Sequence, residues 1–153
     1  MNIPSVFECN LSELKDFSKK LSTKTEVGDI YLLDGDLGSG KTTFARFFIN
    51  ALSDKEKIIR PDTIKSPSFP IMINYPFLDY EIYHYDLYRL KNKNELSEIG
   101  FFEFLEHNIS IVEWPDLVIN NFKLSNYYII KFKFIDINKR LITFDHSEKT
   151  QLL

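Results

Sequence analysis

The feature that most constrains the fold is a glycine-rich stretch, LLDGDLGSGKTTFARFF, which spans residues 32–48. It overlaps a continuous apolar run over residues 30–33, which is typical of a strand buried on both faces of a sheet. After the glycines, aromatic and apolar residues recur at helical spacing and predict a helix over residues 41–52. The stretch is therefore predicted to be a sharp turn between a buried strand and a helix.

The same turn matches a phosphate-binding pattern. Residues 35–42, GDLGSGKT, fit GxxxxGK followed by Ser or Thr, the Walker A pattern, in the strand-to-helix context that the pattern requires. Glycines let the backbone curve around a phosphate, and a helix that begins at Lys41 directs the positive end of its dipole toward the anion. The nucleotide-binding residues predicted in this way are Asp36, Leu37, Gly38, Ser39, Gly40, Lys41, Thr42 and Thr43.

Three side chains of this loop have distinct expected roles. Lys41 is expected to neutralise the β- and γ-phosphates, and the Thr42 hydroxyl is expected to bind Mg²⁺. The second hydroxyl, on Thr43, is expected to reach the α-phosphate. We expect the ammonium of Lys41 to be exposed in the loop and to lie outside the core.

A magnesium site also needs an acidic partner, and two carboxylates are candidates. Glu113 ends the apolar run ISIVE, at the carboxyl end of a predicted strand, where open α/β sheets bind their ligands. Asp86 ends the alternating stretch YEIYHYD and is a candidate to orient water or the metal shell. Either acid could instead cap a turn, and Arg89 could pair with a carboxylate, so the spacing leaves these alternatives open. By residue type, His84 is more typical of structural hydrogen bonding than of catalysis.

Two further features lie in the N-terminal half. Leucine and phenylalanine recur three or four residues apart over residues 11–21 and predict an amphipathic helix capped by Asn10. Residues 53–65 are polar and charged, with Pro61 inside, and we expect a surface connection with one short strand there.

The C-terminal half contains alternating stretches that are typical of antiparallel strands. Residues 69–75 and 80–86 predict a hairpin, and residues 94–106 predict a helix in two pieces, broken at Gly100. A second buried strand is predicted over residues 109–114. Beyond it, YYIIKFKFI and RLITFD predict a C-terminal hairpin on the sheet edge, joined by the turn DINK.

Length and composition limit the class of protein. The chain has 153 residues, 44% of them hydrophobic and 27% charged, which suits one folded domain. Its formal net charge of -3 predicts no broad basic field, so any contact with RNA is expected to be indirect or shared. One cysteine, no targeting segment and no apolar window near the roughly 18 residues of a membrane span predict a cytoplasmic protein without a membrane partner.

Together, these patterns predict one α/β domain over residues 1–153. We expect a central mixed, mostly parallel sheet flanked by helices, with antiparallel strands and a C-terminal hairpin. The strand, glycine turn and helix at residues 30–52 identify the expected architecture as a single P-loop NTPase domain.

Four motifs follow one another along the chain, GDLGSGKTT, SPSF, YHYDLYRL and IVEWPD. In this order they resemble the motifs of the TsaE (YjeE) family, bacterial P-loop ATPases needed for threonylcarbamoyladenosine modification of tRNA. GDLGSGKTT resembles the Walker A motif of that family, and SPSF resembles its Ser-Pro-Thr-Phe/Tyr segment. YHYDLYRL resembles the His-x-Asp-Leu-Tyr-Arg block, and IVEWPD resembles the Glu-Trp-Pro block. The motifs run from Gly35 to Pro115, and the predicted N-terminal helix and C-terminal hairpin also suit the family.

The resemblance implies roles for individual residues. Lys41, Asp86 and Glu113 are the implied catalytic residues, with Asp86 needed for hydrolysis. Thr42 and Glu113 are the implied metal ligands, and ATP and Mg²⁺ are the implied cofactors. Ser68 stands where the family usually has Thr, which keeps the hydroxyl and a possible switch role. The Thr that the family has near the nucleotide is not evident in NLSELKDF, so the adenine contacts stay unassigned.

The resemblance also implies partners. Family members act with the TsaD and TsaB proteins, and ATP hydrolysis resets that complex between rounds of modification. The tRNA is then reached indirectly, through the complex. We expect nucleotide-dependent ordering of SPSF to couple hydrolysis to docking.

Other functions fit the sequence less well. A GTPase would need a final Asp in NKNE at residues 92–95 and an Asp-x-x-Gly motif, and the chain has neither. A small-molecule kinase would need an acceptor pocket and an arginine-rich lid, for which the chain has little length to spare. A nucleotide-sensing adaptor with little intrinsic turnover stays open, and partner-stimulated turnover would separate it from an ATPase.

Overall fold

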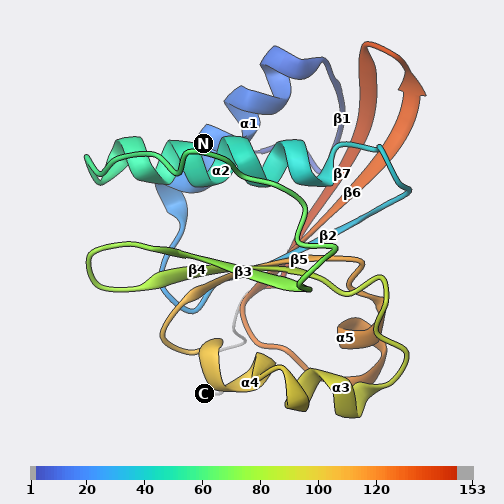
Figure 1. Ribbon diagram of the computed structural model, residues 1–153. Helices are drawn as coiled ribbons and strands as arrows, with labels where there is room; N and C mark the ends of the chain where they lie inside the picture. The colour runs from blue at the N-terminus through green and yellow to red at the C-terminus, as the bar shows by residue number, and fades with distance from the viewer. Residues whose placement is uncertain (1–2, 148–153) are drawn as a thin grey trace, which may run out of the picture.

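The glycine-rich turn joins strand β2 (Ile30–Gly35) to helix α2 (Lys41–Lys55), as the pattern predicts. The computed structural model describes residues 3–147, and in it β2 lies in the middle of a seven-stranded sheet of order β1-β7-β6-β2-β5-β4-β3 (Figure 1). Strand β2 pairs in parallel with β5 (Ile109–Glu113) on one side and β6 (Tyr127–Asp136) on the other. Neighbours on both sides and helices on both faces bury β2, which explains its unbroken apolar run.

Antiparallel strands flank this parallel centre. Strand β3 (Met72–Pro76) pairs with β4 (Glu81–Asp86) in the predicted hairpin, and β4 pairs in parallel with β5. Strands β6 and β7 (Lys139–Ser147) form the predicted C-terminal hairpin. The prediction that this hairpin occupies the sheet edge is wrong, because β1 (Val6–Cys9) pairs with the outer side of β7. A four-residue strand with one buried residue carries too little alternation to be recognised.

Helices cover both faces of the sheet. Helices α1 (Leu11–Lys24) and α2 pack together over one face (Figure 1). Helices α3 (Lys93–Glu98), α4 (Phe101–Phe104) and α5 (Asp116–Asn121) lie over the other. The break between α3 and α4 falls at Gly100 as predicted, whereas α5 had no recognised signal. Within residues 3–147, no helix combines the length and the apolar character that crossing a membrane requires.

Local capping explains where the helices begin. Asn10 and Glu13 form a capping box at the start of α1, in which each side chain accepts a hydrogen bond from the backbone N–H of the other residue. Asn92 and Glu95 repeat this arrangement at α3. Helix α2 extends three residues into the predicted connection, and the short strand expected over residues 53–65 is absent from the structure.

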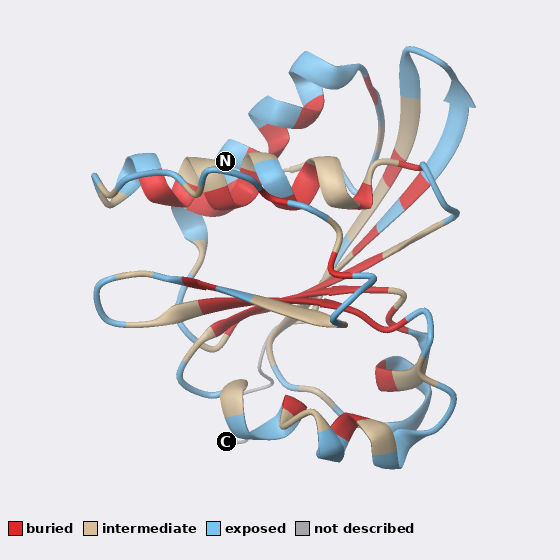
Figure 2. Cartoon of the chain, viewed as in Figure 1, coloured by how far each residue is buried: buried red, intermediate tan, exposed pale blue. Residues whose placement is uncertain are grey.

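The buried side chains form two apolar clusters, one on each face of the sheet (Figure 2). In the cluster under α1 and α2, Phe44 and Phe48 of α2 are fully buried, and the Phe48 ring centre lies 4.6 Å from that of Tyr31 on β2. Full burial of one such side chain contributes about 1.5–3 kcal/mol. The core therefore holds α2 firmly against β2, and it fixes both ends of the glycine turn.

Candidate active site

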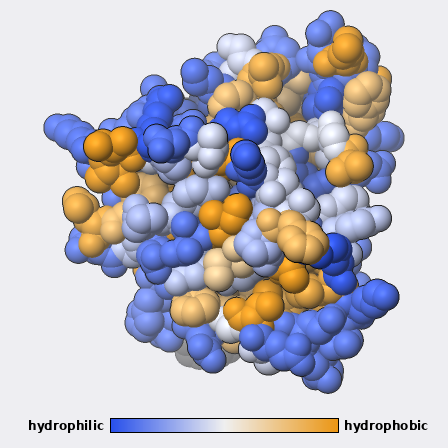
Figure 3. All heavy atoms as spheres, in the orientation of Figure 1, coloured by the Kyte–Doolittle hydropathy of each residue, from blue (hydrophilic) through white to orange (hydrophobic). Residues whose placement is uncertain are grey.

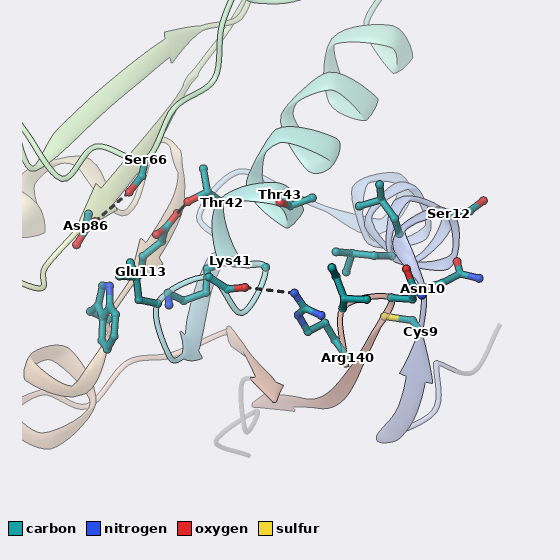
Figure 4. A pocket seen from close by; sticks show the side chains of 18 residues that line it. Cys9, Asn10, Ser12, Lys41, Thr42, Thr43, Ser66, Asp86, Glu113 and Arg140 are labelled. Atoms are coloured by element: carbon teal, nitrogen blue, oxygen red, sulfur yellow. Dashed lines mark hydrogen bonds between the residues drawn. The ribbon is translucent and has the colours of Figure 1, made fainter. Parts of the chain in front are cut away.

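A cleft of about 680 Å³ opens over the glycine turn, at the carboxyl ends of the parallel strands (Figure 4). This is the edge at which open α/β sheets bind ligands. Its lining includes most of the residues predicted from the sequence, namely Leu37, Gly38, Gly40, Lys41, Thr42, Thr43, Asp86 and Glu113. Asp36 and Ser39 are not among the lining residues, and Ser39 is buried.

The loop conformation requires glycine for two different reasons. Gly38 and Gly40 have φ values of 76° and 117°, which residues with a side chain rarely adopt. Gly35 also has a positive φ, of 156°, and space is a further reason there, since a Cβ atom would lie 2.6 Å from the carbonyl oxygen of Phe132 on β6. The glycines of the pattern are therefore explained by the close approach of β6 and by the turn itself.

Lys41 lies inside the loop, and the expectation of an exposed ammonium is wrong. Its side chain is 4% exposed, and Nζ donates hydrogen bonds to the carbonyl oxygen of Asp36, at 2.9 Å, and to that of Gly35. Nζ also lies 4.1 Å from the ring centre of Trp114. Burial lowers the pKa of Lys41, and the nearby carboxylates, Glu113 foremost, oppose this shift. The loop folds back around the side chain and shields it from water.

The two candidate carboxylates lie side by side. Asp86 and Glu113 are register partners in the parallel pair of β4 and β5, and both are buried. Thr42 Oγ1 donates a hydrogen bond to Glu113 Oε1 at 3.0 Å, and His84 Nε2 lies 2.9 Å from the same oxygen. The two residues predicted as metal ligands are thus in direct contact. Figure 4 shows Thr42 on the side of Glu113 and Thr43 on the side of α1.

Asp86 is held by the segment SPSF. Ser66 Oγ donates to Asp86 Oδ2 at 3.0 Å (Figure 4). The backbone N–H of Tyr88 donates to Asp86 Oδ1 at 3.0 Å. Within residues 3–147, Arg89 forms no ion pair with a carboxylate, and its guanidinium instead lies 4.0 Å from the ring centre of Phe69. Ser66 is therefore the hydroxyl of this segment that contacts the site.

Several lining residues had no assigned role in the site on the basis of the sequence. They come from the two ends of the chain, at the start of α1 and in the β6–β7 hairpin, and are Cys9, Asn10, Leu11, Ser12, Leu14, Ile137, Asn138 and Arg140. Local patterns predict a helix capped by Asn10 and the turn DINK in these segments but give their residues no role in the site, because the pairing of β1 with β7 is what brings the two segments to the cleft.

Parallel strands, a glycine turn with positive φ angles and a helix that starts beside two buried carboxylates define an α/β protein of the P-loop NTPase type. The chain belongs to the TsaE family, whose model, described as threonylcarbamoyl adenosine biosynthesis protein TsaE, matches residues 9–142. The resemblance indicated by the four motifs is thereby confirmed.

Individual relatives agree with this assignment. A Rickettsia conorii protein named tRNA threonylcarbamoyladenosine biosynthesis protein TsaE is 37% identical over 141 residues, which are 91% of this chain and 77% of that protein. A Bacillus subtilis protein of the same name is 34% identical and covers 71% of this chain and 65% of its own length. The crystal structure of Bacillus subtilis YdiB superimposes with a TM-score of 0.64 at 26% identity, over 94% of this chain and 87% of that one.

Proposed function

We propose that this chain binds ATP with Mg²⁺ and hydrolyses it, as the ATPase subunit of the machinery that makes threonylcarbamoyladenosine in tRNA. The observation that carries the proposal is the contact between Thr42 Oγ1 and Glu113 Oε1, at 3.0 Å, beside the glycine turn. A hydroxyl at the start of a helix that follows such a turn, together with a carboxylate at the end of a neighbouring strand, forms a site for a metal–phosphate group.

The phosphate tail of the nucleotide is proposed to lie against the start of α2. The first N–H groups of a helix have no partner within it, and the helix dipole favours an anion there. In α2 the first intrahelical bond runs from the N–H of Phe44 to the carbonyl of Gly40, which leaves the preceding N–H groups for a ligand. Lys41 adds a positive charge inside the same loop.

The residues present also fit Mg²⁺. Magnesium prefers oxygen ligands, and proteins usually bind it through one or two carboxylates together with substrate phosphates. Thr42 and Glu113 would hold the ion from the protein side. When bound, Mg²⁺ would supply positive charge that stabilises the phosphoryl oxygens.

Asp86 is proposed to orient the water that attacks the γ-phosphate. Its carboxylate is buried beside Glu113, and hydrogen bonds from Ser66 and from the N–H of Tyr88 fix both of its oxygens. A carboxylate held in this way can accept a hydrogen bond from the attacking water and so fix the orientation of that water. In phosphoryl transfer the protein takes little part in the covalent chemistry, so positioning the reactants is its main contribution.

We further propose that the chain acts in the cytoplasm with TsaD and TsaB, and that hydrolysis resets their complex between rounds of modification. The net charge of -3 supports contact with tRNA through those partners rather than by this chain alone. Apolar side chains interrupt the hydrophilic surface on the face seen in Figure 3, and the strongly exposed Leu37 and Phe69 belong to the loop and to SPSF. Such side chains offer a partner contacts close to the nucleotide.

The test is ATP turnover by the chain alone and with TsaD and TsaB, with Mg²⁺ and with a chelator, alongside tRNA modification in the reconstituted reaction. We expect Mg²⁺-dependent turnover that rises with the partners. Binding of ATP without turnover under all conditions would favour the nucleotide-sensing adaptor. Failure to bind ATP in calorimetry would overturn the proposal.

A further inference from the structure

Arg140 joins the glycine turn to the C-terminal hairpin. Its guanidinium donates to two carbonyl oxygens of the turn, with Nε 3.0 Å from Ser39 and Nη2 3.3 Å from Gly38. Its Nη1 donates to two carbonyl oxygens of the β6–β7 connection, at 2.7 Å to Asp136 and at 3.0 Å to Lys139. One side chain therefore connects two segments about 100 positions apart in the sequence.

The strand that carries Arg140 is paired on both sides. Arg140 is the second residue of β7 and is the register partner of Cys9 on β1 and of Phe134 on β6. The guanidinium carbon also lies 4.6 Å from the ring centre of Phe134. Because β1 and β6 pair with β7 on its two sides, the backbone of Arg140 is fixed, and the planar guanidinium directs its Nε and Nη2 donors toward the glycine turn.

This contact helps to orient two peptide groups of the turn, one of which is also held by the hydrogen bond from the N–H of Ser39 to the carbonyl of Asp36. In a trans peptide the carbonyl of one residue and the N–H of the next point in opposite directions, and residues 3–147 contain no cis peptide bond. With the Ser39 carbonyl directed at Arg140, the N–H of Gly40 points away from it. A carbonyl oxygen turned toward a phosphate would repel it, whereas an N–H attracts it.

We propose that Arg140 is a positioning residue that holds the phosphate-binding loop in its anion-binding conformation. The inference rests on the proposed function, since the ligand of the loop is the proposed nucleotide. Arg140 holds the carbonyls of residues 38 and 39 to one side, and no carboxylate within residues 3–147 lies at salt-bridge distance from its guanidinium. Its positive charge therefore adds to the field that attracts the phosphates.

The experiment compares Arg140→Met and Arg140→Lys with Lys139→Met as the matched control. Lys139→Met removes the same charge one residue away, from an exposed side chain. ADP affinity is measured by calorimetry, and amide hydrogen exchange is followed at residues 36–41 and in the central strands. We expect Arg140→Met to weaken ADP binding about 10–100-fold, the equivalent of losing charge-assisted hydrogen bonds.

Arg140→Lys keeps the positive charge but replaces the planar guanidinium by a single ammonium group. We therefore expect a loss of ADP affinity between those of the unaltered chain and of Arg140→Met. Exchange at residues 36–41 should become faster in both Arg140 variants, while exchange in the central strands stays as in the unaltered chain. Lys139→Met should resemble the unaltered chain in both measurements.

Unchanged ADP affinity and loop exchange in both Arg140 variants would overturn the inference. An equal increase of exchange throughout the sheet would also overturn it, because Arg140 would then stabilise the whole fold. If the unaltered chain binds no nucleotide, the proposed function fails. Loop exchange would still decide separately whether Arg140 holds the turn.

Discussion

Thr42 Oγ1 and Glu113 Oε1 lie 3.0 Å apart, although 71 positions separate the two residues in the sequence. Thr42 is in the first turn of α2, and Glu113 ends β5, which is hydrogen-bonded to β2. The turn between β2 and α2 therefore brings the hydroxyl directly over the neighbouring strand. Since His84 contacts the same oxygen, Glu113 is held from two sides.

Replacing Glu113 by Gln should remove Mg²⁺-dependent hydrolysis while keeping the shape of the side chain. The amide still has an oxygen for Thr42, but it lacks the negative charge that favours a divalent cation. Replacing a residue that contacts a metal ligand but not the metal itself typically costs roughly 10–100-fold in activity, and we expect the ATPase rate of this variant to fall by more than that. Binding of ADP without magnesium should be largely kept. The measurement is turnover against Mg²⁺ concentration. Equal losses of binding and turnover would argue for a structural role of Glu113.

His84→Phe tests whether the imidazole positions Glu113. His84 is fully buried, and within residues 3–147 its Nδ1 has no hydrogen-bond partner, so Nε2 makes the polar contact of the ring. Phenylalanine fills the space without that contact. We expect the activation of the ATPase by Mg²⁺ to fall about 10–100-fold, as measured by titrating the reaction with Mg²⁺. A fall in stability toward urea with unchanged activation would mean that His84 only packs.

Asp86→Asn should reduce hydrolysis more than ATP binding, because the carboxylate is proposed to act on water and not on the phosphate cradle. Ser66→Ala removes one of the two hydrogen bonds to Asp86 and should have a smaller effect in the same direction. Single-turnover kinetics and calorimetry separate the two quantities. Ser97→Ala is the control, since Ser97 is an exposed residue of α3 that does not line the cleft. A Ser66→Ala variant as active as the control would show that Ser66 does not support Asp86.

Alanine at the three glycines of the loop should destabilise the fold to different degrees. Gly35→Ala should cost most, because the new Cβ would overlap the Phe132 carbonyl oxygen. Gly40→Ala and Gly38→Ala add about 1–2 kcal/mol of backbone strain, since both residues have positive φ. A Cβ at Gly38 meets no atom within 4 Å, so this variant should be the mildest. Urea unfolding gives the order, and equal costs at the three positions would contradict it.

Lys41→Met should weaken ATP binding at least about tenfold and also loosen the loop. The side chain of Lys41 bonds to loop carbonyls and stacks on Trp114, so its removal affects the turn as well as the phosphate. Calorimetry measures the affinity, and hydrogen exchange at residues 36–41 measures the loop. Retained ATP affinity would contradict the role of the ammonium, and unchanged exchange would show that the turn holds without it.

Much of the fold follows from local chemistry and could be predicted. Glycines at fixed spacing permit only a few backbone turns, and apolar periodicity separates the strand at residues 30–33 from the helix that follows. The same reasoning finds both hairpins and the break at Gly100. The four motifs were sufficient to indicate the family, because their order and chemistry are specific. The edge strand β1 and helix α5 were missed, since four- and six-residue elements carry little periodic signal.

The amino-acid sequence by itself determined the strand–turn–helix, the identity of the phosphate-loop side chains and the two candidate acids. Only the tertiary structure decided that Lys41 is buried against Trp114, that Ser66 holds Asp86, and that Arg140 reaches the turn from the far end of the chain. The physical reason is the distance along the sequence over which each kind of interaction acts. Turn and helix preferences act over a few residues, whereas these contacts depend on which strands pair and in which register, and that is settled by burial of the whole sheet.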